Sequence, residues 1–250
     1  MTIRAVTFDC WGTLFLDGPS ADERYKLQRV IGIQRVLDSF GITIDRQRLI
    51  RAYEAVEPRL ARAWATNRDL PARLHVTALI EAVDPELSSR VITARVLPLL
   101  IDAYASPALM APPAVDPDAR AVTEALARQG MVLGVVSNTA RTPGVVLGQI
   151  LERAGLVFKV LTFSDEYGIR KPDPQIFKLT LARMGVAPEH AVHVGDDPIL
   201  DVEGPLEAGM AAIQLTPDGR ATSPVKPDVV IKALRQLPDA LKRIAASIVA

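Results

Sequence analysis

Residues 6–14 read Val6-Thr7-Phe8-Asp9-Cys10-Trp11-Gly12-Thr13-Leu14, a short apolar run that ends in an aspartate and continues into a glycine turn. Buried parallel strands are typically short apolar runs of this kind. In open α/β sheets, ligands bind beyond the carboxyl ends of the strands. The stretch therefore predicts a first strand that places Asp9 where chemistry takes place. The alternative is that Asp9 only caps a turn, because aspartate is common in turns.

Length, composition and charge limit the classes of protein to which this chain can belong. Its 250 residues are 49% hydrophobic, which suffices for a sizeable core in one large domain or in a domain with an insertion. The 29 basic and 29 acidic residues balance, so no net field attracts nucleic acid or an anionic membrane. The single cysteine, Cys10, excludes an intrachain disulfide. Since no signal peptide or membrane-spanning stretch is recognisable, we expect a cytoplasmic protein without membrane or nucleic-acid partners.

A long helical pattern follows the first strand. Between residues 22 and 104, apolar side chains recur at three- and four-residue steps, with arginines among the polar positions between them. The proline-rich segment 106–113 then separates this pattern from sequence of a different kind. We therefore predict an α-helical insertion, a cap domain, over residues 17–105, and a core made of residues 1–16 and 106–250.

From residue 131 onward, strand and helix patterns alternate. An apolar run over residues 131–136 leads directly into Ser137 and Asn138. Such alternation predicts an α/β fold with a doubly wound, Rossmann-like parallel sheet. The expected helices cover residues 143–154, 175–184 and 199–208 and begin again at 234, and the expected strands cover residues 157–163, 191–194, 211–215 and 229–231.

Carboxylates and a hydroxyl group stand where several of these strands end. Asp9 ends the first strand, Ser137 ends the second, and Asp196 and Asp201 follow a later strand. The ends of parallel strands share one edge of the sheet, so we expect these side chains to converge there. Clustered carboxylates without a histidine or thiolate cluster suit Mg²⁺. Lys171, in a loop held extended by prolines, is a candidate to balance their charge, with a surface lysine as the alternative.

These features together resemble the motifs of the haloacid dehalogenase-like hydrolase superfamily. Its first motif, D-x-D-x-T, reads Asp9-Cys10-Trp11-Gly12-Thr13 here, and its second, a strand-terminal serine or threonine, matches Ser137. The third, a lysine in a G-x-x-K-P-D-P loop, matches Lys171, and the fourth, G-D-x-x-x-x-D, matches residues 195–201. The helical insertion directly after the first motif resembles the α-helical cap of the family.

The resemblance implies a Mg²⁺-dependent phosphatase of a small phosphorylated metabolite. Asp9 would attack phosphorus and form an aspartyl-phosphate, which divides one difficult displacement into two easier ones. Lys171 would balance the charge of the nucleophile and of the transition state. The implied ligands of Mg²⁺ are Asp9, the main-chain carbonyl of Trp11, Asp196 and Asp201. The implied substrate-binding groups are Ser137, Asn138 and the turn at Gly12 and Thr13.

One position departs from the phosphatases of this family. Where they carry a second aspartate that protonates the leaving group, this chain has Trp11, whose indole has no proton to exchange at neutral pH. The 2-haloacid dehalogenases of the family carry a tyrosine there, and a halide leaves without a proton. Against dehalogenation stands the acidic fourth motif, which those enzymes lack in intact form. A dehalogenase and a weakly active or inactive binding protein therefore remain alternatives to the phosphatase. The sequence also leaves open whether the protein forms a homodimer.

Two further residue types carry weaker signals. Cys10 is not expected to be a nucleophile, because adjacent strand residues face opposite ways and no histidine is near it in the sequence. His75, His190 and His193 show no spacing typical of metal ligands. We place His75 in the cap and the other two histidines beside or within a strand.

Overall fold

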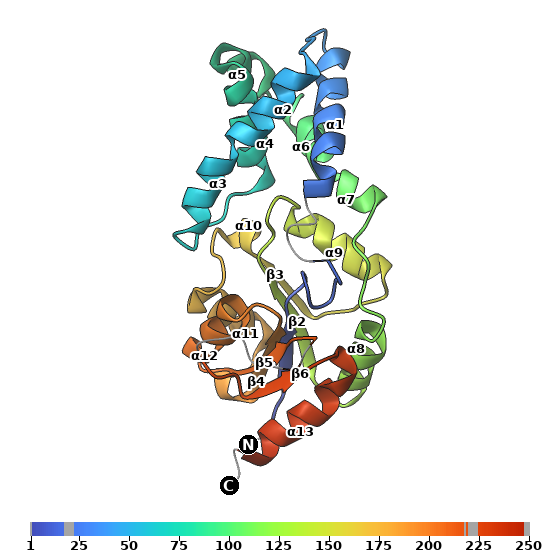
Figure 1. Cartoon of the computed structure of the whole chain (residues 1–250), viewed down its shortest axis with the longest axis vertical. Helices are drawn as coiled ribbons and strands as arrows, with labels where there is room; N and C mark the ends of the chain where they lie inside the picture. Colours follow the sequence, from blue (N-terminus) through green and yellow to red (C-terminus); the bar gives the residue numbers. More distant parts are fainter. Residues whose placement is uncertain (1, 18–22, 218, 220–224, 248–250) are drawn as a thin grey trace.

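The computed structural model describes residues 2–17, 23–217, 219 and 225–247. Within this part, six strands form one parallel sheet in the order β3-β2-β1-β4-β5-β6. The strands are β1 (Ala5–Phe8), β2 (Val132–Ser137), β3 (Val160–Phe163), β4 (Ala191–Gly195), β5 (Ala211–Leu215) and β6 (Val229–Ile231). Helices lie on both sides of the sheet (Figure 1), which confirms the predicted doubly wound α/β fold.

The helices that cover the sheet are α8 (Ala119–Arg128), α9 (Gly144–Arg153), α11 (Pro174–Met184), α12 (Gly204–Glu207) and α13 (Leu237–Ser247). Side chains of α8, α9 and α13 form one apolar cluster with Val6 and Phe8 of β1. Side chains of α11 form another with Ala5, on the opposite face. Successive residues of a strand point to opposite faces, so β1 supplies both clusters. The first strand is therefore the centre of the core, as its apolar sequence predicts.

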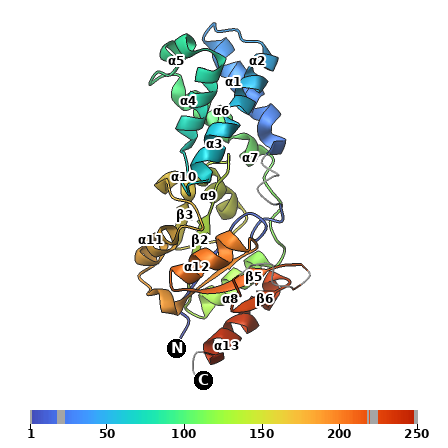
Figure 2. The same ribbon diagram turned by 60° about the vertical axis from the view of Figure 1, so that its left-hand side comes forward.

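Between β1 and α8 the chain forms a group of helices that we call the helical lobe. Its helices are α1 (Lys26–Ser39), α2 (Arg46–Ala55), α3 (Glu57–Trp64), α4 (Ala72–Val83), α5 (Pro85–Val91) and α6 (Leu97–Ala105). The lobe has an apolar cluster of its own, with Ile33 and Leu79 among its buried members. Figures 1 and 2 show the lobe beyond the C-terminal end of the strands, with α7 (Pro107–Met110) leading back to the sheet. Residues 18–22, which belong to the predicted cap, lie outside the described part.

Two elements differ from their expected bounds. The strand expected over residues 157–163 begins later, at β3, because Val157 is 80% exposed and precedes the sheet. The helix expected over residues 199–208 is a π-helix (Ile199–Glu203) that continues into α12. Pro205 has no N–H to donate, so a regular α-helical ladder cannot run through this segment.

The remaining short helices complete the chain. They are α10 (Ser164–Tyr167) and the 3₁₀ turns Pro188–His190 and Leu234–Gln236. The last of these turns occupies the start of the helix expected from residue 234, and α13 follows it. The predicted helix also included residues 248–250, which lie outside the described part. Across the described ranges, no helix combines the length and the apolar character needed to cross a bilayer.

Candidate active site

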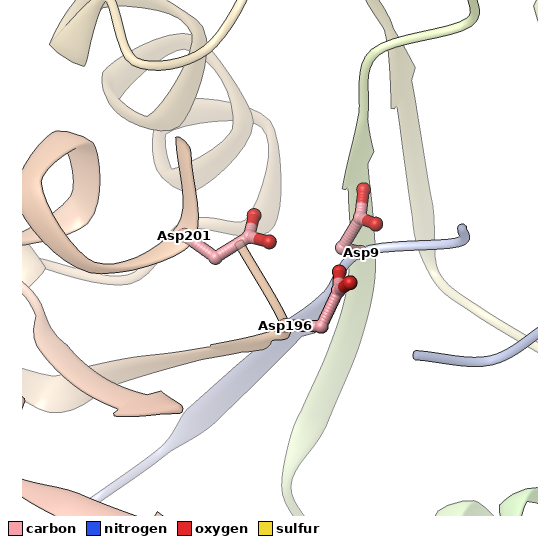
Figure 3. Close-up of side chains that lie close together, drawn as sticks. All are labelled: Asp9, Asp196 and Asp201. Atoms are coloured by element: carbon pink, nitrogen blue, oxygen red, sulfur yellow. The ribbon is translucent and has the colours of Figure 1, made fainter. Parts of the chain in front are cut away.

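The C-terminal end of the sheet brings Asp9, Ser137 and Asp196 together. β1 lies between β2 and β4, so the residues at the ends of these three strands are neighbours. The N–H of Asp9 donates to the carbonyl of Val194 at 3.0 Å, which continues the pairing of β1 with β4. Figure 3 shows the carboxylates of Asp9 and Asp196 close together and that of Asp201 directed towards them from the segment after β4. The predicted convergence of the acidic strand-end residues is therefore present.

Two glycines allow these carboxylates to approach the backbone. Gly12 has a φ of +74°, and a Cβ atom there would lie 2.3 Å from Oδ2 of Asp196. A Cβ atom at Gly195 would lie 2.2 Å from Cγ of Asp201. Neither gap admits a methyl group, and a positive φ is unfavourable for other residues. Gly12 thus serves the site by letting Asp196 lie against the turn that follows Asp9.

Lys171 joins two of the three carboxylates. Its Nζ donates to Oδ1 of Asp9 at 2.6 Å and to Oδ1 of Asp201 at 2.5 Å, and all three side chains are buried. Asn138 holds the main chain of this lysine, since its Nδ2 donates to the Lys171 carbonyl at 3.1 Å and its Oδ1 accepts from the Lys171 N–H at 2.9 Å. The structure thus brings Asn138 to the site, where one donor and one acceptor of its amide fix the backbone of Lys171.

Burial and mutual repulsion change the pKa values of the site. Burial raises the pKa of Asp9 to about 6, against the opposing effect of Lys171. Burial, with repulsion from Asp9 and Asp201, raises the pKa of Asp196 to about 7. Burial acts on Asp201 in the same direction, but the charge of Lys171 and a hydrogen bond with His193 outweigh it and hold its pKa below the usual range. One ammonium group therefore leaves this cluster of three carboxylates short of positive charge.

The donor set fits a divalent cation. Asp9, Asp196 and Asp201 each offer a ligand oxygen, and these atoms lie within 4.8 Å of one another. Carboxylate oxygens without nitrogen or sulfur ligands are the set that Mg²⁺ prefers. In Asp201, Oδ1 accepts from Lys171 and from His193, and Oδ2 accepts from the N–H of Asp197 at 3.0 Å. Asp9 and Asp196 thus keep more lone pairs for direct ligation of a cation than Asp201 does. The arrangement of Asp201 suits a contact with the cation through a water molecule.

The loop after Asp9 contains two orphaned polar atoms. Trp11 is 2% exposed, and its ring meets the ring of Phe15 edge-on, with centroids 5.5 Å apart. Among the described residues, neither Nε1 of Trp11 nor Oγ1 of Thr13 has a hydrogen-bond partner, although both atoms are buried. Buried polar groups usually have partners, so each of these two atoms is an exception in this loop.

Ser137 and Cys10 both bear on which group is the nucleophile. The hydroxyl of Ser137 is buried and stabilises the ionised form of Asp9 through a hydrogen bond. Cys10 is fully buried, and burial raises the pKa of its thiol far above its usual range. A protonated, enclosed thiol is a poor nucleophile. Asp9 remains the candidate nucleophile at this end of the sheet.

His193 is a contributor that the sequence analysis missed. It lies in β4, fully buried, with Nε2 3.0 Å from Oδ1 of Asp201 and Nδ1 2.8 Å from Oγ1 of Thr7. Burial lowers its pKa, so the neutral ring donates from Nε2 and accepts at Nδ1. Thr7 and His193 are register partners in β1 and β4. A polar residue at the same level of two otherwise apolar strands was the available signal.

A second missed feature lies where the helical lobe meets the sheet. Asp69, between α3 and α4, has a fully buried side chain and pairs with Arg170 at 2.7 Å. Arg170 directly precedes Lys171. Asp69 stands in a loop where periodicity gives no guidance, so the sequence held no signal for this contact.

Comparisons with known proteins agree with the family resemblance that the sequence motifs indicate. A family model described as haloacid dehalogenase-like hydrolase matches residues 3–209. The chain is 27% identical to the glyceraldehyde 3-phosphate phosphatase of Methanopyrus kandleri, with 97% of this chain and 99% of that one covered. It is 36% identical to the phosphoserine phosphatase of Thermus thermophilus over only 48% of this chain and 49% of the relative. A solved structure, the 2-haloacid dehalogenase of Pseudomonas syringae pv. Tomato DC3000, is similar with a TM-score of 0.65 and 25% identity, covering 97% and 99% of the two chains.

Proposed function

Because the chain belongs to the haloacid dehalogenase-like hydrolase family, we propose that it is a Mg²⁺-dependent phosphatase of a small phosphorylated metabolite. The observation that carries this proposal is the cluster of Asp9, Asp196 and Asp201 with ligand oxygens within 4.8 Å of one another, beside the ammonium of Lys171. The relatives named as phosphatases support it. Phosphoryl groups carry negative charge. A divalent metal ion bound by the carboxylates would supply the positive charge that attracts them.

Asp9 is the proposed nucleophile. Its free oxygen attacks phosphorus, the bond from phosphorus to the leaving oxygen breaks, and an aspartyl-phosphate forms. Attack by water on phosphorus then releases inorganic phosphate and restores the carboxylate. Lys171 keeps Asp9 ionised and neutralises charge that develops on the phosphoryl oxygens. Ser137 donates to those oxygens. The predicted turn supplies no such donors in this conformation, since the N–H of Gly12 donates to the carbonyl of Asp17 at 2.9 Å and that of Thr13 to the carbonyl of Cys10 at 3.4 Å.

The carboxylates of Asp9 and Asp196 and the main-chain carbonyl of Trp11 would hold Mg²⁺, with Asp201 acting through water. When bound, the ion supplies charge neutralisation for the phosphoryl oxygens and fixes the in-line geometry of displacement. His193 orients Asp201 through its hydrogen bond to Oδ1, and the hydrogen bond between Thr7 and His193 fixes the tautomer of the histidine.

The helical lobe is the proposed cap of the site. It stands beyond the C-terminal end of the strands and reaches the loops around Lys171 through Asp69. An element in this place excludes water from the aspartyl-phosphate until hydrolysis and contacts the part of the substrate that does not react. The corresponding domain division is residues 17–105 for the cap and residues 1–16 and 106–250 for the core.

Trp11 determines how the rate of hydrolysis depends on the leaving group of the phosphate. A general acid contributes roughly 10²- to 10⁴-fold to such reactions, and an indole cannot serve as one. The preferred substrates are therefore phosphates whose leaving group departs as a stable anion, such as acyl or aryl phosphates. Alkyl phosphates are expected to react more slowly.

Dehalogenation of a 2-haloacid is the second candidate, favoured by Trp11. Asp9 would then attack carbon and displace a halide, which needs no proton. The similarity to the 2-haloacid dehalogenase of Pseudomonas syringae supports this alternative at the level of the fold. The acidic cluster argues against it, because displacement of a halide at carbon has no need of a metal-binding set of three carboxylates.

One experiment tests both candidates. The purified protein is assayed against a panel of aryl, acyl and alkyl phosphates and of 2-haloacids, with Mg²⁺ and with a chelator, and released phosphate and halide are measured. We expect phosphate release that requires Mg²⁺ and is fastest with aryl and acyl phosphates. Asp9→Asn protein, prepared in parallel, corrects for contaminating phosphatases. Halide release that is insensitive to chelator would overturn the proposed function in favour of dehalogenation.

A further inference from the structure

Asp69 enters the border between the helical lobe and the sheet as a buried anion. Within the lobe, its Oδ1 accepts from Nε1 of Trp64 at 3.0 Å and from the N–H of Leu70 at 2.8 Å. These two bonds fix the direction of its side chain, so that Oδ2 is left to face the loops of the core. Two hydrogen bonds from the lobe therefore orient the carboxylate of Asp69 towards the core.

Three core side chains meet at Oδ2 of Asp69. Arg170 donates to it at 2.7 Å, Ser164 donates through its hydroxyl, and the hydroxyl of Thr139 lies 3.4 Å away. The guanidinium of Arg170 also lies over the ring of Trp64, with its carbon 4.7 Å from the ring centroid. A single lobe residue therefore engages two loops of the core, the one after β2 and the one before Lys171.

The backbone repeats this connection. The N–H of Asp69 donates to the carbonyl of Gly168 at 3.3 Å, and the N–H of Arg170 donates to the carbonyl of Asn67 at 2.9 Å. Arg68 and Ile169 form an isolated β-bridge between these hydrogen bonds. The lobe loop and the segment that ends at Lys171 thus lie against each other as a short antiparallel pair.

These contacts close a ring that contains the active-site lysine. Asp69 contacts Thr139 and Arg170, and the residues next to these, Asn138 and Lys171, hold each other through two hydrogen bonds. The N–H of Thr139 also donates to the hydroxyl of Ser164 at 3.0 Å. The backbone of Lys171 is therefore held from one side by Asn138 and from the other by the residue that Asp69 pairs with.

The pair of Glu57 with Arg141 is a natural contrast. It too joins the lobe to the loop after β2, but the Glu57 side chain is 55% exposed, whereas the Asp69 side chain is 0% exposed. The partner arginines, Arg141 and Arg170, are both mostly buried, so the two pairs differ in the carboxylate. Water screens the exposed Glu57 carboxylate, whereas loss of the buried Asp69 carboxylate leaves the buried groups around it without their acceptor. The two lobe anions therefore have different consequences, although both cross the same border.

We propose that Asp69 is a positioning residue, through which the helical lobe holds the Arg170–Lys171 segment so that Nζ of Lys171 stays between Asp9 and Asp201. This inference rests on the proposed function only for its effect on turnover. The site is then complete only when the lobe is seated. A lobe that lifts away takes the partner of Arg170 with it and releases the loop that carries Lys171.

The test measures Lys171 directly, without an assay of activity. Native protein is treated briefly with an amine-acetylating reagent, and labelling of each lysine is quantified by mass spectrometry, with the exposed Lys242 as internal reference. Lys171 is protected in the wild type, since it is 2% exposed. We expect Asp69→Asn to raise labelling of Lys171 at least about tenfold relative to Lys242, and Glu57→Gln to change it less than about twofold. Arg170→Lys, which keeps the charge, should give an intermediate rise and serves if Asp69→Asn is poorly folded.

Turnover supplies the second readout. In Asp69→Asn, kcat should fall about tenfold or more while KM changes little, because the loss lies in the placement of a reacting group. Combined with Lys171→Met, the same substitution should cause no further loss, because it acts through the lysine. Unchanged labelling of Lys171 in a folded Asp69→Asn protein overturns the proposal, as does increased labelling with unchanged kcat. If the wild type releases no phosphate, the proposed function fails, and labelling alone decides the role of Asp69.

Discussion

The end of the sheet and the border of the helical lobe are both rich in polar residues, yet they are built for different purposes. At the sheet end, Asp9 and Asp196 are held by strand register with carboxylates that repel each other, and their pKa values are raised. At the lobe border, polar groups satisfy one another. Arg29, for example, is fully buried and donates to the carbonyl of Tyr104 at 3.1 Å and to the hydroxyl of Thr142 at 2.9 Å. The carboxylates of the first region lack sufficient positive charge, whereas the polar groups of the second region have hydrogen-bond partners within the protein.

Because of this difference, we expect substitutions in the two regions to affect turnover and stability differently. Removal of a functional group at the sheet end should stop turnover and leave the fold nearly unchanged, because like charges there oppose folding. Removal of one at the lobe border should do the reverse, since it leaves partners unsatisfied in a buried place. Asp69 is the exception, because it lies at the border and its contacts lead to Lys171.

The largest expected effect is that of Asp9→Asn. The amide is nearly isosteric but cannot form the acyl-phosphate, so turnover should fall by about 10⁴-fold or more. The melting temperature should stay close to that of the wild type, because Lys171 keeps its bond to Asp201. Steady-state kinetics and thermal unfolding measure the two effects. Cys10→Ala, one residue along, is the matched control and should keep turnover within about threefold. Substantial turnover in Asp9→Asn would remove Asp9 as the nucleophile.

The sheet-end region was accessible to prediction because short-range sequence and sheet geometry determine it. A buried parallel strand followed by Asp9, and another followed by Asp196, must meet if the strands are neighbours. His193 was missed because its role depends on pairing with Thr7 across two strands, and pairing is a property of the assembled sheet. Asp69 could not be found, because its contacts depend on how the helical lobe is seated. Helix periodicity predicts which faces are buried, not which loop of another body they meet.

The second effect in size concerns Arg29. Arg29→Met should lower the free energy of unfolding by about 3 kcal/mol, because buried acceptors on Tyr104 and Thr142 lose a charged donor. Urea denaturation with an unchanged m-value would measure this loss. Thr142→Val removes one acceptor only and should cost about 1 kcal/mol. Turnover by the folded Arg29→Met protein should change much less than in Asp9→Asn. Loss of turnover without loss of stability would instead place Arg29 in the substrate site.

The third effect is a dependence of Mg²⁺ stabilisation on pH. The pKa values of about 6 for Asp9 and about 7 for Asp196 lie above those of the unfolded chain, so the metal-free native state binds more protons. The contribution of these groups to stability is therefore present at low pH and is lost as the pH rises through 7. Mg²⁺ needs the ionised carboxylates, so its stabilising effect should grow between pH 5 and pH 8.

At a Mg²⁺ concentration 100 times Kd, the stabilisation at pH 8 should approach about 2.7 kcal/mol. Thermal unfolding with and without Mg²⁺ at the two pH values measures it. Asp196→Asn is the control and should abolish most of the effect. An equal rise in melting temperature at pH 5 and pH 8 would contradict binding at this cluster.

The smallest expected effect is a gain of rate in Trp11→Asp. A carboxylate two residues after Asp9 should supply part of the missing general acid, so hydrolysis of alkyl phosphates should rise about tenfold, and that of aryl phosphates much less. Loss of a buried ring costs about 3–5 kcal/mol of stability, so assays must be run well below the melting temperature. Trp11→Asn creates a similar cavity without a titratable proton and should show no gain. Equal rates for the two variants would mean that Trp11 does not stand in the place of a proton donor.

The central place of β1 affects the order in which the molecule can assemble. β1 pairs with β2, which begins at Val132, and with β4, which begins at Ala191. Contacts of such large sequence separation form slowly. The contacts among the lobe helices, including that between α1 and α6, all lie within residues 26–105, which are synthesised before β2. Until β4 arrives, β1 is an apolar edge strand, which is a template for aggregation. A chain interrupted before β4 would therefore carry the helical lobe on a half-sheet with an unpaired apolar edge, and it would lack Asp196 and Asp201.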